Sequence, residues 1–137
     1  MNKKVKKSIF FVSALFLGFN LGFGQANPDN IVIPESADAL ENPYSNDESV
    51  VRKGEKVYKK VCWICHGDEG AGDGPSVPTL TVQPADLSKP NIKALSDGAL
   101  FWWITNGGNG MQPFKDTLSK DQIWMVVNYI RRLQGKM

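Results

Sequence analysis

The segment Cys62-Trp63-Ile64-Cys65-His66 constrains this 137-residue chain more than any other feature, because it contains both cysteines and the single histidine. A catalytic metal site with three histidines, or with two histidines and a carboxylate, is therefore impossible within one chain. A structural zinc site needs four Cys or His ligands, and the chain has only these three. A framework of several disulfides is also excluded. Any metal chemistry must therefore run through Cys62, Cys65 and His66.

Residues 1–26 have the three parts of a secretory signal peptide. Four lysines are followed by an apolar run from Ile9 to Phe23 and then by small residues. The run is shorter than the ~20 residues that a membrane-spanning helix needs, so we expect cleavage and export to the periplasm rather than a retained anchor. The small-residue rule allows cleavage after Gly24 or after Ala26. The segment has no cysteine, which excludes a lipid-modified N-terminal cysteine.

Removal of this signal peptide reverses the net charge. The full chain has 16 Lys and Arg against 14 Asp and Glu, and the signal peptide holds four lysines and no acid, so the formal charge changes from +2 to −2. Residues 27–47 form an acidic, proline-containing lead segment, which we expect to be extended, with a turn at Asn42–Pro43. Residues 52–137 hold 12 basic and 8 acidic residues. This balance is not basic enough to suggest a nucleic-acid partner.

Hydrophobic periodicity and capping residues predict three helices in the remaining chain. Asp47, Ser96 and Ser119 are the expected N-caps, and Ser119 with Gln122 makes a capping box. The segments between the helices are rich in Gly and Pro, and none alternates long enough to predict a strand. We therefore predict a small all-α domain over residues 48–137, with three to four helices and long loops. The helices are expected at about Glu48–Val61, Asp97–Thr105 and Lys120–Leu133.

A domain with so little core of its own needs something other than side chains at its centre. In an exported protein, a C-x-x-C-H motif at the end of a helix predicts one covalently attached c-type haem. Cys62 and Cys65 lie one helical turn apart and can form thioethers with two vinyl groups along one porphyrin edge, and His66 then projects toward the iron as proximal ligand. A thioredoxin-like redox pair would follow a strand, not a helix. A Cys62–Cys65 disulfide would leave His66 unexplained, and zinc would need ligands from another chain.

The chain has no second histidine, which excludes ligation by two histidines, and the remaining soft ligand is a thioether. Met125 lies near the apolar stripe of the last predicted helix, where packing explains it, and Met137 is the terminal residue. Met111 lies in the turn-rich loop 106–114, whose glycines allow the backbone to approach a flat ring. We therefore predict Met111 as the distal iron ligand.

With these residues identified, the chain resembles the mono-haem class I cytochromes c of the bacterial, exported kind. The resemblance covers residues 48–137, and the acidic lead segment also resembles segments that precede such domains. It implies that Gly54 and Tyr58 pack against Tyr129 on the last helix. Gly54 costs the helix about 1 kcal/mol relative to Ala, so a close helix–helix contact is a reasonable explanation for it.

The resemblance also assigns roles in the loops. It implies that the carbonyl of Pro75 or of Pro78 accepts a hydrogen bond from His66, which would orient the ring and raise its basicity. The spacing does not decide between the two prolines. Phe114 keeps its family place after the methionine, whereas Pro113 stands one residue later than in the usual Met-Pro pair.

The four tryptophans are expected to surround the haem as hydrophobic fill. One of Trp102 and Trp103 is expected to face it and to donate its N–H to a propionate, because adjacent residues of a helix point to different sides. The sequence leaves open which of the two does so.

Ligation by His66 and Met111 leaves no open iron position, which favours a one-electron carrier over an enzyme. We expect a monomeric periplasmic shuttle between respiratory redox partners. Lysines on the first predicted helix could steer it to an acidic partner, while the acidic lead segment screens that surface or addresses another. One alternative is a subunit of a larger membrane-associated oxidoreductase complex, with the lead segment as its docking part. Another is a haem-based ligand sensor in which Met111 dissociates.

Overall fold

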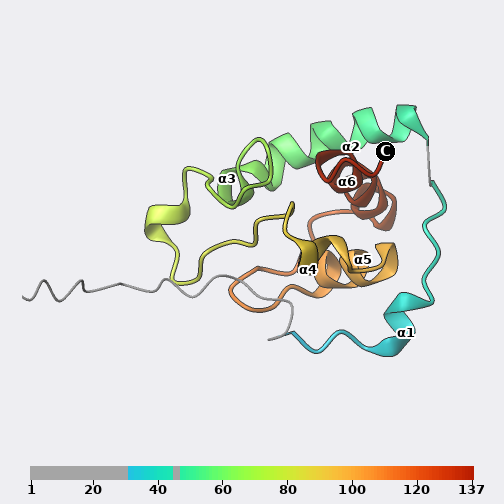
Figure 1. Ribbon diagram of the computed structural model, residues 1–137, viewed down its shortest axis with the longest axis horizontal. Coiled ribbons are helices and arrows are strands. Elements are labelled where there is room, and N and C mark those ends of the chain that lie inside the picture. Colours follow the sequence, from blue (N-terminus) through green and yellow to red (C-terminus); the bar gives the residue numbers. More distant parts are fainter. Residues whose placement is uncertain (1–30, 45–46) are drawn as a thin grey trace, which may run out of the picture.

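The computed structural model describes residues 31–44 and 47–137 (Figure 1), so the expected signal peptide lies outside the described residues. This described part contains six α-helices, one 3-10 turn and no strand, and its only isolated bridge joins Gly108 to Met111. The prediction of an all-α fold is confirmed. None of the described helices is long and apolar enough to cross a membrane. The elements are α1 (Glu35–Asp38), α2 (Glu48–Val61), α3 (Trp63–His66), η2 (Val77–Thr79), α4 (Pro90–Lys93), α5 (Asp97–Asn106) and α6 (Lys120–Leu133).

The three longer helices begin where the capping residues predict. The side chains of Asp47, Ser96 and Ser119 each accept a backbone N–H from the first turn of α2, α5 and α6 respectively. The capping box of α6 is complete, because the Gln122 side chain also accepts the N–H of Ser119 at 2.9 Å. These bonds satisfy donors that a helix leaves unpaired at its start. Only α5 differs in length, ending one residue later than expected.

Helices α2 and α6 pack against each other and form the core of the molecule (Figure 1). A Cβ atom on Gly54 would lie 1.9 Å from the carbonyl oxygen of Met125, so only glycine allows this approach. The rings of Tyr58 and Tyr129 lie beside it, with centroids 5.1 Å apart. The Tyr58 hydroxyl donates to the carbonyl of Gly67 at 2.8 Å. The expected contact of Gly54 and Tyr58 with Tyr129 is confirmed.

The described part of the lead segment is not simply extended, which corrects the expectation above. It contains the one-turn helix α1, which packs on α5 (Figure 1). The expected turn is present, since the N–H of Tyr44 donates to the Asn42 side chain at 3.0 Å. Helices α1, α3 and α4 have four residues each, too few to show a helical period. That is why the sequence did not predict them.

Candidate haem site

Helix α3 continues α2 almost without interruption and carries the C-x-x-C-H motif. The N–H of Cys62 still donates to the Tyr58 carbonyl of α2 at 2.8 Å, and the N–H of His66 donates to the Cys62 carbonyl at 3.0 Å. Cys62, Cys65 and His66 all line one cavity of about 340 Å³. The turn of α3 therefore brings both cysteines and the histidine to the same cavity.

The cavity lies between α3, α5, residues 80–85 and the loop that follows α5. Its walls are mainly apolar, and Leu100, Ile104 and Phe114 are among the buried side chains that form them. Burial of such side chains around a flat apolar ligand is favourable, whereas an open cavity of this size within a small domain would lose packing contacts. The walls thus suit a large, mostly apolar cofactor.

His66 is oriented by the carbonyl of Ala85, which lies 3.1 Å from its Nδ1 atom. A carbonyl can only accept, so Nδ1 carries the proton and Nε2 keeps the lone pair that a metal ligand requires. Burial lowers the pKa of His66, and the bond to Ala85 opposes this effect only in part. A neutral imidazole held by a backbone carbonyl is the usual state of a metal-ligating histidine.

The partner of His66 corrects the expectation that Pro75 or Pro78 would accept this bond. The chain after α3 folds back along it, with N–H groups of Gly74 and Ser76 donating to the carbonyls of Cys65 and Ile64. Pro75 is therefore held between two residues that pair with the backbone of α3, and Pro78 lies exposed in η2. The loop returns to the histidine only later in the chain.

Ala85 reaches His66 through a second turn of this loop. The N–H of Leu87 donates to the carbonyl of Gly70 at 2.7 Å, and the Gln83 side chain donates to the carbonyl of Gly72. These bonds bring residues 83–87 back beside the start of the loop. A long Gly-rich connection contains no periodicity that would predict this return, and the sequence therefore could not identify Ala85.

The Cys62 thiol is poorly suited to dithiol redox chemistry. Burial, and secondarily the proximity of Cys65, raise the pKa of Cys62 to about 12. The thiolate is the form of cysteine that takes part in thiol–disulfide exchange, and this raised pKa leaves little Cys62 thiolate at neutral pH. This argues against a thioredoxin-like activity of the pair.

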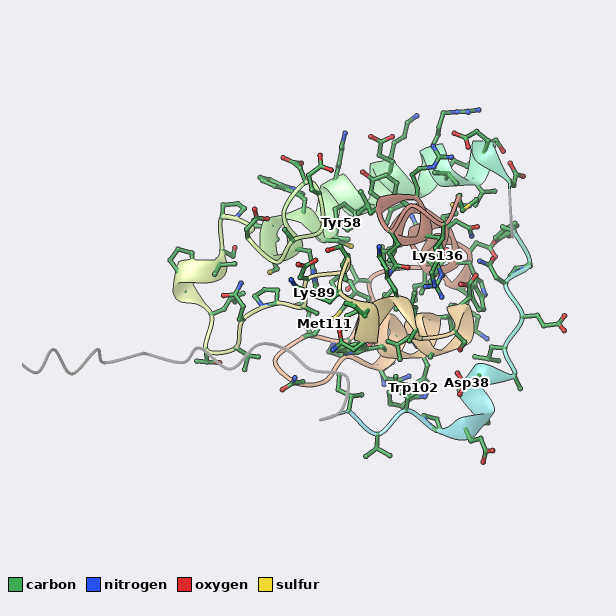
Figure 2. All side chains as sticks on the ribbon, viewed as in Figure 1. Asp38, Tyr58, Lys89, Trp102, Met111 and Lys136 are labelled. Atoms are coloured by element: carbon green, nitrogen blue, oxygen red, sulfur yellow. The ribbon has the colours of Figure 1, made fainter. Side chains whose placement is uncertain are left out.

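Met111 lines the same cavity as His66, beside α5 in Figure 2. Its loop turns sharply, with positive φ angles at Gly107, Gly108 and Gly110 and at the non-glycine residue Asn109. A Cβ atom on Gly107 would lie 2.5 Å from the Met111 carbonyl oxygen, so this turn requires glycine. The structure thus brings together all four site residues that the sequence predicted.

The other methionines lie away from the cavity. Neither Met125 nor Met137 is among the residues that line it. The backbone of Met125 packs against Gly54, and Met137 packs against the hydrophobic core. Both therefore have structural roles that do not depend on a metal.

Two buried N–H donors at the cavity have no hydrogen-bond partner within the described chain. They are Nε1 of Trp103 and Nδ2 of Asn109, and both residues line the cavity. Trp103 is only 6% exposed, whereas Trp102 lies on the side of α5 that faces α1 (Figure 2). Buried donors without acceptors are costly, so they indicate that a ligand with acceptor groups completes the site. Haem carries two carboxylates and fits this requirement.

Trp103, rather than Trp102, is therefore the tryptophan that lines the cavity. Asn109 was not identified from the sequence. The sequence contains only a weak signal for Asn109, because a lone polar residue among glycines is typical of any turn. Only its positive φ angle and buried amide distinguish it.

A family model described as cytochrome C oxidase, cbb3-type, subunit III matches residues 49–130. Cytochrome c-L of Methylorubrum extorquens is 29% identical over 108 residues, which cover 77% of this chain and 51% of that protein. Among solved structures, cytochrome cL of Methylophaga aminisulfidivorans has a TM-score of 0.56 at 26% identity, covering 67% of this chain and 58% of that one. A chain of the reducing HAO-like protein complex of Kuenenia stuttgartiensis has a TM-score of 0.60 at 32% identity, covering 69% and 49%. The present chain thus spans about half the length of these relatives.

Proposed function

This chain belongs to the cytochrome c family, whose members carry a covalently attached c-type haem, and we propose that it is an exported one-electron carrier with His66 and Met111 as axial ligands. The observation that carries the proposal is that His66 and Met111 line one cavity, which Cys62 and Cys65 also line. Fold and family alone would not assign the ligands, because function depends on the site.

The four residues have distinct roles in this proposal. Cys62 and Cys65 hold the cofactor by thioether bonds, and His66, oriented by Ala85, presents Nε2 to the iron. Met111 supplies a thioether, which favours the reduced iron and raises the reduction potential. When bound, the haem supplies an iron centre that accepts and releases one electron.

The surrounding residues hold this arrangement fixed. Apolar walls exclude water, which lowers the dielectric around the site, and Trp103 and Asn109 offer N–H donors to the polar groups of the ligand. With His66 and Met111 as its two protein ligands, the iron of a bound haem would have no position left for a substrate. The site is therefore suited to electron transfer rather than to catalysis on a bound molecule.

The visible spectrum of the purified holoprotein tests the ligation. We expect a c-type reduced spectrum and, in the oxidised form, the methionine–iron charge-transfer band. Met111→Ala should abolish that band, while the control Met125→Ala should retain it. A wild-type spectrum without the band would contradict Met111 as ligand, and a haem lost on denaturation would contradict the thioether bonds.

Export is part of the proposal and has its own test. We expect the mature chain in the periplasmic fraction, with its N-terminus at Gln25 or Asn27 after cleavage behind Gly24 or Ala26. Intact mass and N-terminal sequencing of that fraction would show this. An uncleaved chain in the membrane fraction would indicate a retained anchor instead.

A second candidate role is that of a subunit in a larger oxidoreductase complex. The observation that favours it is that one structural relative belongs to a protein complex. Size-exclusion chromatography of the native periplasmic fraction separates the two roles. A haem peak at the mass of the monomer supports the free carrier, whereas a larger assembly supports the subunit.

A further inference from the structure

Residues 31–44, which we call the strap, make contacts that the proposed ligation does not explain. The strap lies outside residues 49–130, which match the family model. In Figure 1 it runs along the lower edge of the molecule beside α5 and then rises toward the start of α2. The strap therefore lies beside α5, the helix that forms one wall of the cavity.

The strap sits directly on the N-terminal turn of α5. A Cβ atom on Gly98 would lie 1.9 Å from the carbonyl oxygen of Ala37 and 2.9 Å from that of Leu40. The hydroxyl of Ser96, the N-cap of α5, donates to the carboxylate of Asp38. A side chain at position 98 would therefore displace the strap.

Asn42 connects the strap to two helices at once. Its Nδ2 donates to Asp97 of α5 at 2.7 Å, and its Oδ1 accepts from Asn128 of α6 at 3.2 Å. The other carboxylate oxygen of Asp97 accepts from Nε of the buried Arg131 at 2.6 Å. The start of α5 is thus held from the strap on one side and from α6 on the other.

The other end of the strap reaches the loop that carries Met111. Ile31 lies against Gly108, with its Cδ1 atom 3.8 Å from the position of a Cβ there. Gly108 and Met111 pair through two backbone hydrogen bonds of 2.8 and 3.0 Å. The same loop is tied to the end of α5, because the N–H of Phe114 donates to the carbonyl of Ile104 at 3.1 Å.

We propose that the strap is a positioning segment, which holds α5 and the Met111 loop as one unit and so keeps the methionine on the iron. The inference rests on the proposed ligation by Met111. The loop contains a run of left-handed residues, mostly glycine, and such a run gains much conformational entropy when released. Contacts that restrain both the loop and the helix before it reduce the fraction of molecules in which the loop is open.

The test uses the full-length holoprotein with Asn42→Ala, which removes the hydrogen bonds to α5 and α6, and Gly98→Ala, which displaces the strap. Asp38→Asn is a milder third variant at an exposed position. Two quantities are measured: the rate at which carbon monoxide binds the reduced protein, and the urea concentration at which the methionine–iron band disappears. We expect carbon monoxide to bind at least about fivefold faster in Asn42→Ala, since a lost hydrogen bond shifts a local opening equilibrium by about that factor.

Ser119→Ala is the matched control, because it removes the N-cap of α6, whose hydrogen bonds join Ser119 to Gln122 and Ile123 of that same helix. In the control, the band and the helical circular dichroism should be lost at the same urea concentration. In the strap variants, the methionine–iron band should be lost at a lower urea concentration than the helical circular dichroism. If Asn42→Ala and Gly98→Ala instead behave like Ser119→Ala, the strap only adds global stability and the proposal is wrong. If the wild type lacks the band, ligation by Met111 has failed, which is a separate result that also overturns the proposal.

Discussion

The α2–α6 helix pair and the cavity beside it differ in burial and in hydrogen bonding. Most of the fully buried side chains belong to the helix pair: Tyr58, Ile123, Val126, Val127 and Asn128. Even the amide of Asn128 is bonded within the protein, to the carbonyl of Trp124 at 2.8 Å. Apart from Nε of Arg132, the buried side-chain polar groups of the helix pair therefore find their partners within the described residues.

The cavity, in contrast, lacks partners for several of its own groups. Cys62, His66 and Met111 are each only partly buried, and the N–H groups of Trp103 and Asn109 have no acceptor within the described residues. The two regions therefore have different roles. The helix pair supplies stability of its own, and the loops and α5 are shaped to be completed by the cofactor.

Gly54→Ala should change stability more than any other variant, because it adds a methyl group where α2 and α6 approach each other most closely. The added methyl group would lie 1.9 Å from the Met125 carbonyl oxygen, a backbone atom, so we expect a cost of about 3 kcal/mol or more, at or above the top of the usual range for overpacking. This loss exceeds the gain of about 1 kcal/mol in helix propensity. Urea denaturation of the holoprotein measures the net change. Lys53→Ala, exposed on the same helix, should leave stability almost unchanged, and equal effects of the two variants would contradict the close contact.

Trp103→Phe tests the cavity, and its expected effect is smaller. If the indole N–H bonds a carboxylate of the bound haem, its loss should lower the stability of the holoprotein by about 1 kcal/mol, the usual net contribution of one hydrogen bond. The reduction potential should also fall, because an unpaired carboxylate stabilises the oxidised iron. The control Trp102→Phe keeps Trp103 in place and should leave the potential unchanged. A potential that responds equally to both variants would show that the N–H of Trp103 has no special role.

The same division explains how much the sequence could predict. The starts of α2 and α6 follow from the N-caps Asp47 and Ser119, and their extent follows from the apolar stripe of each helix. The site residues followed from counting, because one histidine and two cysteines leave few choices. Each of these inferences uses only neighbours in the sequence or the composition of the whole chain.

The features that the sequence missed depend on contacts between distant residues. Ala85 bonds His66 only because the loop after α3 turns back twice, and Asn109 is buried only because of its backbone angles. Trp102 and Trp103 could not be separated, since α5 is apolar on nearly every side and its periodicity does not indicate one inner face. Asn42 contacts residues 55 and 86 positions away, which no local pattern reveals.

The exposed side of α2 offers a test that should leave stability unchanged. Lys59 is paired with Glu55 at 2.7 Å, whereas no ion pair within the described chain involves Lys53, Lys56 or Lys60. Replacing these three lysines with glutamine should slow oxidation of the reduced protein by the anion ferricyanide several-fold at low salt, with little difference near 0.15 M salt. Replacing Lys93, Lys120 and Lys136 changes the net charge equally and serves as the control. Equal rates in the two triple variants would remove any steering role of α2.

The smallest expected effect concerns the start of α2 and its response to acid. Hydrogen bonds from the Ser49 hydroxyl and N–H, and from the Val50 N–H, keep the pKa of Asp47 below its usual value. Because the folded pKa is the lower one, this carboxylate contributes stability above its unfolded pKa, and the contribution is lost as the pH falls through the folded value. The melting temperature of the wild type should therefore fall slightly more between pH 5 and pH 3 than that of Asp47→Asn, which still caps the helix but does not titrate. Parallel melting curves for the two proteins across this range would show that the cap acts through its hydrogen bonds alone, without a contribution from its charge.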